Sequence, residues 1–477
     1  MYLGIDVGTS GVKAVLADAA GAVRATRTVA LDLATPRPGW CEQDPADWWT
    51  AVREAVRGLD ARDVRAIGLS GQMHGAVCLD AGLAVLRPAI LWNDTRSFAQ
   101  ADRLAGVAGV EETIGVRPMP GFTATKIMWM AAHEPELHGR IAHVVTPKDW
   151  VRWKMTSALA MEMSDAAGTC WLDQASRQWS SAMAKASDTD PSWLPPLLEG
   201  TAIAGRLSGE AAAELGLEAG IPVAAGGGDA AQGGIGIGAV NPGDAFLSLG
   251  TSGQLFTVTD GYVASPGTLV HAFAHALPDT WFHMACLMNG ASPLAWWADV
   301  CGTEVGALLE AAEGADAGPV LFLPYLVGER TPLNDPHIRG GFYGMGPGTR
   351  REAMTVAVLE GIAFSIAEAA KALEKAGTAP ARMGAIGGGA RSDRLLQLVA
   401  DATGIALDRY EGAETGAALG AARTAMIADG MAVAEVATTP EIAARFEPRA
   451  EQAERLAPRH ARWRRLYDAL APGAEAL

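Results

Sequence analysis

Cysteines and basic residues are scarce in this chain, and long apolar runs are missing. Its 477 residues include five cysteines, an odd number, widely spread and without a CxxC pair, which argues against a disulfide framework or a structural zinc site. The formal net charge of -16 opposes binding to the phosphate backbone of nucleic acids. No uncharged apolar run reaches the roughly 18 residues that cross a bilayer, and the opening MYLGIDVG lacks the features of a secretion signal. We therefore expect a cytoplasmic protein with no nucleic-acid partner and no membrane contact.

The rest of the composition is typical of a globular protein with two domains. The chain is 49% hydrophobic and 19% charged, and its length exceeds the size at which a single core keeps growing. Short β-rich runs at 66–69 and 89–92 alternate with helical patterns, which indicates an α/β fold. Apolar residues at three- and four-residue spacing predict one helix over 351–375, and a second is expected over 393–402.

An internal repeat divides the sequence. The letters GTSG occur at 8–11 and again at 250–253, each time between two β-rich runs, so each copy predicts two strands joined by a tight glycine turn. Glycine-rich turns also follow apolar runs at 223–229 and 385–391, and we interpret them as equivalent features of the two copies. The repeat predicts a duplicated domain, with domains at 1–240 and 241–477.

Both glycine hairpins are candidate phosphate sites. Successive backbone N–H groups in tight glycine turns hold phosphate without a P-loop, and the sequence has no GxxxxGK[ST] segment to supply one. Side chains add donors in the first copy. The candidates for binding phosphate are Thr9, Ser10 and Lys13 in the first hairpin and Gly250, Thr251 and Ser252 in the second.

Two aspartates lie beside these glycine turns. Asp6 ends the strand before the first hairpin, where its carboxylate either holds Mg²⁺ or accepts hydrogen bonds from its own turn. Asp229 follows the GGG run of the turn at 223–229. It is either a general base that deprotonates an attacking hydroxyl or a helix N-cap.

Polar clusters at strand ends suggest where a polyol binds. The glycine-bounded loop at 71–75 contains Gln72, Met73 and His74, and a lone His in such a loop is otherwise structural. Trp92, Asn93 and Asp94 form a second cluster, in which the Trp ring packs on a sugar and its neighbours bind hydroxyls. In the second half, the loop at 328–332 follows an apolar run, and Gly388, Gly389 and Ala390 lead toward a helix N-terminus, which favours phosphate or ribose but is also compatible with a simple turn.

Taken together, these motifs resemble the FGGY carbohydrate kinases of the actin-like ATPase superfamily, most closely the branch that acts on D-xylulose. The resemblance covers nearly the whole chain and is carried, in order, by MYLGIDVGTSGVK, WCEQDPADWW, GQMHGAV, RPAILWND, MPGFTATKIMW, PKDW, MSDAAGTCWLD, AGGGDA, LSLGTSG, FLPYLVGERTP and IGGGARS. It implies two ribonuclease-H-like α/β domains around a catalytic cleft, with sugar held mainly by the first and ATP by the second. The implied cofactors are ATP and Mg²⁺.

The resemblance also implies roles for individual residues. Asp229 would be the base, Asp6 would serve magnesium and phosphate, and the metal would lie near both carboxylates. Met73 and His74 match the substrate loop, while Thr251 and the turn at 388–390 match the ATP site.

One departure bears on the substrate, because the family often has Asn directly after the catalytic Asp and this chain has Ala230. Another polyol, such as ribulose, gluconate or glycerol, is the nearest alternative. A non-catalytic actin-like ATPase is a more distant one. A homodimer is compatible with the sequence, which does not determine the oligomeric state.

Overall fold

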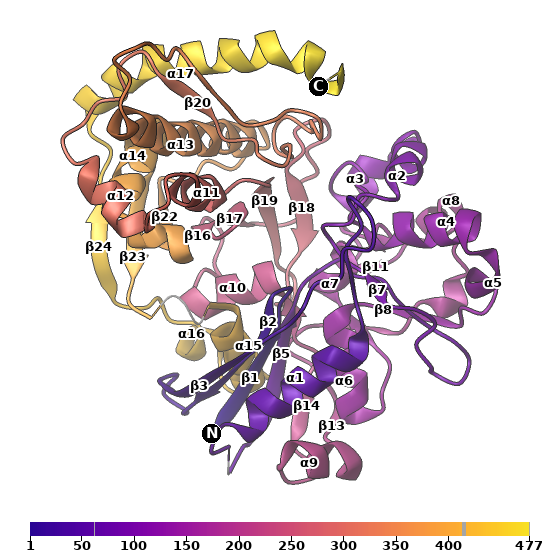
Figure 1. The fold of residues 1–477 in the computed structure, drawn as a ribbon. Helices are drawn as coiled ribbons and strands as arrows, with labels where there is room; N and C mark the ends of the chain where they lie inside the picture. The colour runs from indigo at the N-terminus through magenta and orange to yellow at the C-terminus, as the bar shows by residue number, and fades with distance from the viewer. Residues whose placement is uncertain (62, 413–415, 477) are drawn as a thin grey trace.

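The computed structural model describes residues 1–61, 63–412 and 416–476 and is built around two seven-stranded sheets (Figure 1). The first has the order β13-β14-β5-β1-β2-β3, with β15 beside β5, and the second has the order β18-β19-β17-β16-β22-β23-β24. Strands of the first sheet are β1 (Tyr2–Val7), β2 (Gly11–Ala17), β3 (Val23–Ala30), β5 (Ala66–Gly71), β13 (Ile203–Arg206), β14 (Pro222–Ala224) and β15 (Gly227–Gly228). Strands of the second are β16 (Ala245–Leu249), β17 (Gly253–Thr259), β18 (His271–Ala274), β19 (Trp281–Leu287), β22 (Arg382–Ile386), β23 (Ala406–Tyr410) and β24 (Ile442–Phe446).

The two sheets repeat one topology. In the first, β1 is antiparallel to β2 and parallel to β5, and in the second, β16 is antiparallel to β17 and parallel to β22. An antiparallel strand then closes one edge of each sheet, β13 next to β14 and β24 next to β23. The predicted glycine hairpins are therefore confirmed as equivalent parts of a duplicated α/β unit.

The predicted equivalence of the two later glycine turns is wrong by one strand. The turn at 385–391 follows β22, which lies beside β16, whereas the turn at 223–229 follows β14, which lies beside β5 and not beside β1. The counterpart of β22 is β5. A glycine run signals a tight turn wherever it occurs, so it contains no information on the position of its strand in the sheet.

Short two-stranded sheets supplement the two large ones. Their strands are β4 (Glu42–Gln43) with β7 (Ala89–Ile90), β6 (Val77–Leu79) with β8 (His143–Val145), β9 (Met161–Glu162) with β12 (Leu197–Leu198), β10 (Leu172–Asp173) with β11 (Gln178–Trp179), and β20 (Leu321–Leu323) with β21 (Gly341–Tyr343). The run at 66–69 thus forms part of β5, while the strand predicted at 89–92 is reduced to the two residues of β7.

Helices cover the sheets and form a side lobe. In Figure 1 the lobe lies to the right and contains α2–α5, α7 and α8. Helices encoded in the first half are α1 (Pro45–Arg57), α2 (Phe98–Ala105), α3 (Val110–Ile114), α4 (Thr123–His133), α5 (Pro135–His138), α6 (Pro147–Thr156), α7 (Met163–Ala167), α8 (Ser181–Ala186), η1 (Pro191–Trp193), α9 (Gly209–Leu215) and α10 (Asp229–Ile237). Those of the second half are α11 (Ser292–Val300), α12 (Val305–Ala311), α13 (Arg351–Lys375), η2 (Gly388–Arg391), α14 (Asp393–Thr403), α15 (Gly416–Ala428), α16 (Val433–Val436), α17 (Ala450–Leu470) and η4 (Ala471–Ala476).

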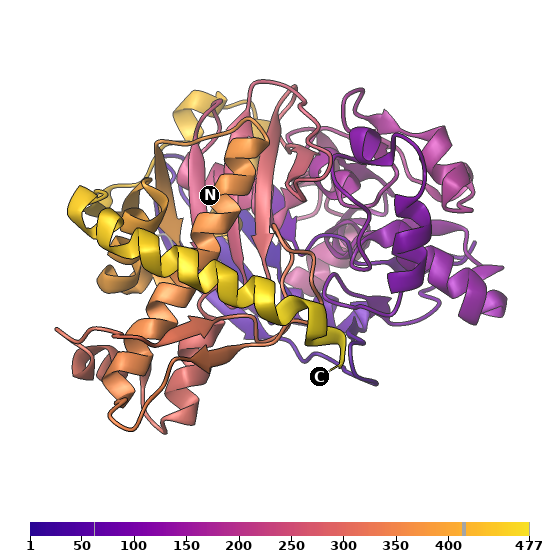
Figure 2. The ribbon, with the colours of Figure 1, turned by 90° about the horizontal axis from the view of Figure 1, so that it is seen from above.

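The helix predicted at 351–375 is confirmed as α13, and the one at 393–402 as α14. α13 is long and apolar enough to cross a membrane, but 83% of its most apolar window is buried inside the protein. It lies at the centre of the apolar core of the second half, which also includes residues of β16, β22 and α17. Figure 2 shows α17 crossing over α13 on the outside of this half. α13 is therefore a core helix.

Helix α15 belongs to the second half of the sequence but packs against the first sheet. It contacts β1 and β5, and also α10. Glycines allow this close approach, because a Cβ on Gly4 would lie 2.0 Å from the Ala418 carbonyl oxygen and one on Gly420 would lie 1.8 Å from the Gln232 carbonyl oxygen. A division of the chain near residue 240 therefore separates α15 from the sheet that it covers.

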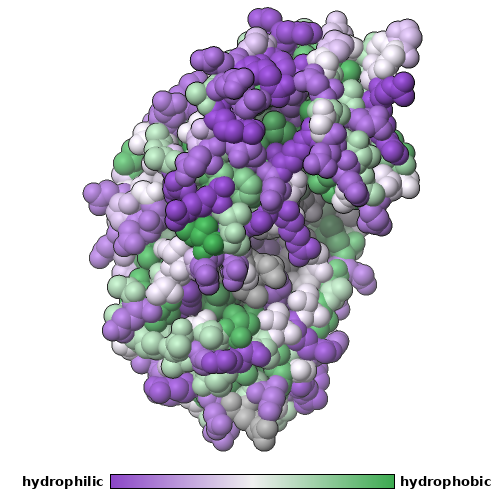
Figure 3. All heavy atoms as spheres, turned by 90° about the vertical axis from the view of Figure 1, so that its left-hand side faces the viewer, coloured by the Kyte–Doolittle hydropathy of each residue, from purple (hydrophilic) through white to green (hydrophobic). Residues whose placement is uncertain are grey.

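Hydrophilic residues prevail on the outer face seen in Figure 3, with hydrophobic residues interspersed among them. The apolar side chains are instead concentrated in separate internal cores. One core packs the first sheet against α1, α6 and α9, and another joins the side lobe to α10 and to the β17–β19 strands. The lobe is thereby in contact with both halves.

Candidate active site

The turns of the two glycine hairpins differ in length by one residue, because Val7 pairs with Val12 in the first and Leu249 pairs with Gly253 in the second. The Gly8 N–H donates to the Gly11 carbonyl at 3.0 Å, and the Gly250 N–H donates to the Ser252 carbonyl at 3.0 Å. Ser10 and Thr251, at the tips, are exposed. Tight glycine turns can leave backbone N–H groups open to an anion. The Gly8 and Gly250 N–H groups are themselves used within their turns, so phosphate binding by the hairpins stays a prediction.

A pocket of about 110 Å³ lies between the halves and joins residues from both. The first hairpin contributes Thr9, and the second contributes Ser252. The complete lining comprises Thr9, Met73, His74, Trp92, Asp229, Ser252, Gly253, Gln254, His271, Met284, Cys286, Leu287, Met288 and Arg330. Six residues that the sequence singled out, Thr9, Met73, His74, Trp92, Asp229 and Ser252, thus meet in one cavity.

Asp229 is the first residue of α10, and Gly228 is the N-cap. Burial, reinforced by the negative charge of Asp6, raises the pKa of Asp229 to about 7, although the nearby backbone N–H groups of Asp229 and Ala230 act in the opposite direction. A carboxylate with a pKa near neutrality can accept a proton at physiological pH and release it again. Ala230 itself is buried in an apolar cluster.

Asp6 lies on β1, where it pairs with Lys13 across the hairpin and with Ser70 on β5. Burial raises the pKa of Asp6, while a 2.7 Å hydrogen bond from the Ser70 hydroxyl and the charge of Lys13 lower it. The negative charge of Asp6 acts on Asp229, but Asp6 is not among the described residues that line the pocket.

Thr9 links the two predicted sugar clusters. Its hydroxyl accepts a hydrogen bond from Trp92 Nε1 at 2.9 Å and donates to Gln72 Oε1 at 3.0 Å. Gln72 is buried and donates in turn to Gln43 Oε1 at 3.0 Å. Gln72 therefore fixes the orientation of Thr9 and, through Thr9, that of Trp92. Trp92 lines the cavity.

His74 is a neutral residue in a left-handed turn. It has φ 68°, and its ring stacks on Phe122 with the centroids 4.6 Å apart. Burial holds the pKa of His74 well below its ordinary value, so the ring is neutral. Because a carbonyl oxygen only accepts hydrogen bonds, Nδ1 carries the ring proton and donates to the Gly168 carbonyl at 2.8 Å. Nε2 is then an acceptor that suits a hydroxyl group.

The second predicted cluster divides into residues with different surroundings. Trp92 lines the pocket, but Asp94 is buried in an ion pair with Arg96 at 2.7 Å and accepts the Cys41 N–H at 2.7 Å. Asn93 is half-buried. Asp94 thus stabilises the loop that carries Trp92.

The turn at 388–390 lies against the second hairpin. A Cβ on Gly387 would be 2.7 Å from the Leu249 carbonyl oxygen, and one on Gly389 would be 2.8 Å from the Ala291 Cβ. Gly388 is exposed, whereas Gly389 and Ala390 are buried. Since β16 and β22 are parallel neighbours, their carboxyl ends bring the hairpin and this turn to one edge of the sheet, the usual ligand edge of such sheets.

Arg330, which was not among the predicted site residues, lines the pocket from the loop at 328–332. Its guanidinium lies over the Trp92 ring, 5.5 Å from the centroid, and Nη2 donates to the Trp92 carbonyl at 3.4 Å. Arg330 therefore brings a cation of the second half to a residue of the first. The only signal in the sequence was a polar loop after an apolar run, and such loops are common.

Comparisons with known proteins agree on the family. Models of the FGGY family of carbohydrate kinases match the chain with the N-terminal domain at residues 1–236 and the C-terminal domain at 245–428. A xylulose kinase of Escherichia coli is 44% identical, with 99% of each chain covered. A crystal structure described as a xyloylose kinase from Brucella ovis superposes with a TM-score of 0.93 at 43% identity, covering 98% of this chain and 99% of its own. A gluconate kinase from Lactobacillus acidophilus superposes with a TM-score of 0.92 at 25% identity, covering 99% of each chain.

The chain has the fold expected from the sequence, two α/β units with a pocket between them, and the solved kinases superpose on it over nearly its full length. Both family domains match in the expected order, and the relatives are similar over their full length. The chain belongs to the FGGY family of carbohydrate kinases.

Proposed function

We propose that this chain is an ATP-dependent xylulokinase that transfers the γ-phosphoryl group of ATP to O5 of D-xylulose. The observation that carries the substrate is the similarity to a xylulose kinase at 44% identity over nearly all of both chains. The fold by itself does not choose the sugar, since a gluconate kinase superposes almost equally well. Because its proposed phosphoryl donor is ATP, we propose that the enzyme acts in the cytoplasm.

In this proposal the cavity between the halves binds the sugar. The Trp92 ring would pack against the carbon face of the sugar, with Met73 beside the ring. His74 Nε2 would accept a hydrogen bond from one hydroxyl group, and Arg330 would donate hydrogen bonds to others. Gln72, Asn93 and Asp94 support this surface from the loops behind. Residues 1–240 thus hold mainly the sugar and residues 241–477 mainly ATP, apart from α15, which covers the first sheet.

Asp229 is proposed as the general base. Its carboxylate takes the proton from the O5 hydroxyl as the O5–P bond forms and the bond from the γ-phosphorus to the bridging oxygen of ADP breaks. The pKa of about 7 suits a group that must be ionised to accept this proton. Positioning and charge neutralisation supply most of the acceleration in phosphoryl transfer.

The phosphates of ATP are proposed to lie between the two hairpins. Thr9, Ser10 and Lys13 would approach them from the first half, and Thr251 and Ser252 from the second, mainly through backbone N–H groups, while Gly250, whose N–H donates to the Ser252 carbonyl, would shape the turn. The turn formed by Gly388, Gly389 and Ala390 would hold the nucleoside end, beside the second hairpin.

The carboxyl groups fit a magnesium ion that arrives with ATP. Within the described residues, no group of three or more His, Cys, Asp or Glu side chains could hold a metal ion, whereas Mg²⁺ typically uses one or two carboxylates together with phosphate oxygens and water. Asp6, with Asp229 nearby, provides this set. The ion would neutralise phosphate charge when bound.

The test compares wild-type protein with Asp229→Asn in magnesium-dependent ADP release, using D-xylulose, D-ribulose, L-xylulose, gluconate, glycerol and no sugar. We expect D-xylulose to give the highest kcat/KM by roughly tenfold or more, about 1.4 kcal/mol. Removal of a general base should lower kcat by on the order of 10² to 10⁴. A folded Asp229→Asn protein with wild-type turnover would exclude this base.

The panel also tests the alternatives. If another polyol is preferred, the phosphoryl-transfer mechanism stands and the specificity does not, with Ala230 as the first position to examine. ATP-dependent polymer formation without sugar-stimulated ADP release would instead indicate a non-catalytic actin-like ATPase.

A further inference from the structure

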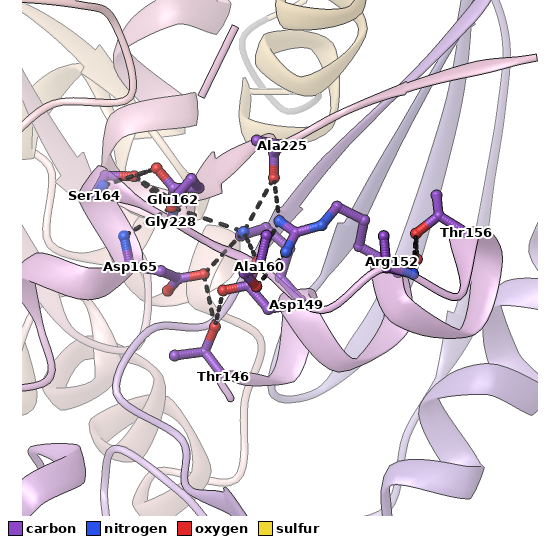
Figure 4. Close-up of polar contacts among 12 residues, drawn as sticks. Thr146, Asp149, Arg152, Thr156, Ala160, Glu162, Ser164, Asp165, Ala225 and Gly228 are labelled. Carbon is purple, nitrogen blue, oxygen red and sulfur yellow. Dashed lines mark hydrogen bonds and ion pairs between the residues drawn. The ribbon is translucent and has the colours of Figure 1, made fainter. Parts of the chain in front are cut away.

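A cluster of ionisable side chains lies fully buried in the first half, next to the residues that precede Asp229. Each of these side chains has 0% relative exposure. The members are Lys148, Asp149, Arg152, Glu162 and Asp165, and Figure 4 labels the last four of them together with their partners. Removing several charges from water is costly unless they are paired and hydrogen-bonded. The hydrogen bonds of the cluster show which part of the backbone it fixes.

The charges are paired within the cluster. Lys148 Nζ is 2.5 Å from Asp149 Oδ1 and 3.7 Å from Glu162 Oε1, and Arg152 Nη1 is 2.6 Å from Asp149 Oδ1. Lys148 Nζ is also 3.2 Å from Asp165 Oδ2, and burial raises the pKa of this carboxyl well above its ordinary value. Two cations thus lie among three acidic side chains, and each buried charge has a partner of opposite sign, as a dry interior requires.

The cluster and the neighbouring Ser164 fix the two ends of the segment at 225–228, which connects β14 to α10. At one end, the Ala225 carbonyl accepts hydrogen bonds from Lys148 Nζ at 3.2 Å and Arg152 Nη1 at 3.0 Å. At the other end, the Gly228 N–H donates to Ser164 Oγ at 2.9 Å. The next residue after this segment is Asp229.

The Ser164 hydroxyl has a defined orientation. It donates to Glu162, whose two carboxylate oxygens lie 2.9 and 3.0 Å from Oγ. Glu162 is itself fixed, because it caps α7 by accepting the N–H groups of Ser164 and Asp165 at 2.7 Å each. With its proton directed at Glu162, the hydroxyl presents a lone pair to Gly228. Figure 4 shows Ser164 and Glu162 beside Gly228.

We propose that Ser164 is a positioning residue for phosphoryl transfer: its hydroxyl, oriented by Glu162, holds the Gly228 amide and so aims the Asp229 carboxylate into the sugar pocket. This inference rests on the proposed role of Asp229 as the base. Ser164 is not among the pocket-lining residues that the structure describes, so it acts through the main chain and not on the substrate.

The test is the kinetics of Ser164→Ala, with Ser187→Ala as the matched control. Ser187 is also a buried serine of the first half, and its hydroxyl accepts the Trp171 Nε1–H at 2.9 Å, so both substitutions leave one buried N–H without its acceptor. Both variants should unfold at a lower urea concentration than wild type. Only Ser164→Ala should lower kcat, by about 10- to 100-fold, because small displacements of a reacting group have effects of this size.

Other readouts separate positioning from loss of structure. The KM values for D-xylulose and ATP should stay within about twofold of wild type in Ser164→Ala, because the sugar and nucleotide contacts remain. Ser164→Thr, which keeps the hydroxyl, should recover most of kcat. If Ser164→Ala does not fold, Ser164→Cys replaces it, since a thiol fills the site but is a weaker acceptor, and it should show the same selective loss.

The outcomes are distinguishable from failure of the proposed function. Wild-type kcat in Ser164→Ala or Ser164→Cys, together with an inactive Asp229→Asn, overturns the positioning role and leaves the base assignment intact. An equal loss of kcat in Ser187→Ala also overturns it. An active Asp229→Asn overturns the base assignment, and the inference falls with it.

Discussion

Replacing His275 with Asn should make the stability of the protein less dependent on pH. His275 is fully buried, its Nδ1 accepts the Leu277 N–H at 3.1 Å, and its ring packs edge-on against Phe256 and Phe282. Burial, helped by the charge of Arg177, lowers the pKa of His275 from 6.5 to about 3. Asn can keep an acceptor close to the position of Nδ1 but takes up no proton in this pH range.

The sign and the size follow from this pKa. Because the folded value lies below the unfolded one, the unfolded chain binds a proton first as the pH falls below 6.5, and the free energy of unfolding decreases. For one such group the loss is about 1.4 kcal/mol at pH 5.5 and about 2.7 kcal/mol at pH 4.5, relative to pH 7.5. His275→Asn should lack this part of the loss.

The assay is urea unfolding at pH 7.5, 6.5 and 5.5, followed by tryptophan fluorescence. The difference in unfolding free energy between pH 7.5 and pH 5.5 should be about 1.4 kcal/mol smaller in His275→Asn than in wild type. His337 is exposed, so His337→Asn is the control and should leave the difference unchanged. An equal pH dependence in wild type and His275→Asn would refute the reasoning.

Two further substitutions test the packing of the halves and the pocket. Gly420→Ala should destabilise the protein by about 1–3 kcal/mol, because its Cβ would lie 1.8 Å from the Gln232 carbonyl oxygen, whereas Gly306→Ala, with no atom within 4 Å, should be neutral or stabilising in urea unfolding. Arg330→Met should lower kcat/KM for D-xylulose by roughly 10- to 100-fold, the equivalent of about 1.5–3 kcal/mol for a hydrogen bond from a charged group. Arg339→Met, in an exposed part of the same loop region, should leave kcat/KM unchanged, and an equal loss in both Arg variants would contradict the role of Arg330.

Local patterns predicted the elements of the fold well. The spacing of apolar residues over 351–375 gave a helix with the bounds of α13, and the repeated GTSG letters marked two hairpins that are equivalent in the two sheets. Such patterns depend on neighbours within a few residues. The order of strands depends instead on partners far apart in sequence, which explains why the glycine turns at 223–229 and 385–391 were matched wrongly.

The candidate site likewise combines residues that local patterns predict with residues that only contacts distant in sequence bring into place. Strand-end loops predict Met73, His74, Trp92 and Asp229 as site residues, and all four line one pocket. Arg330 was missed because its contact with Trp92 spans 238 positions of sequence. Charged residues are usually exposed, so nothing local distinguished Lys148 and its buried partners from solvated surface.

The position of α15 has a consequence for the biogenesis of the protein. Residues 416–428 cover the face of a sheet whose first strand begins at Tyr2, and the apolar cluster between them includes Tyr2, Ala66 and Met426. During translation, nearly 90% of the polypeptide must leave the ribosome before that face is covered. The nascent sheet would meanwhile be a surface for chaperones, and a chain that ends before α15 would leave it open to aggregation.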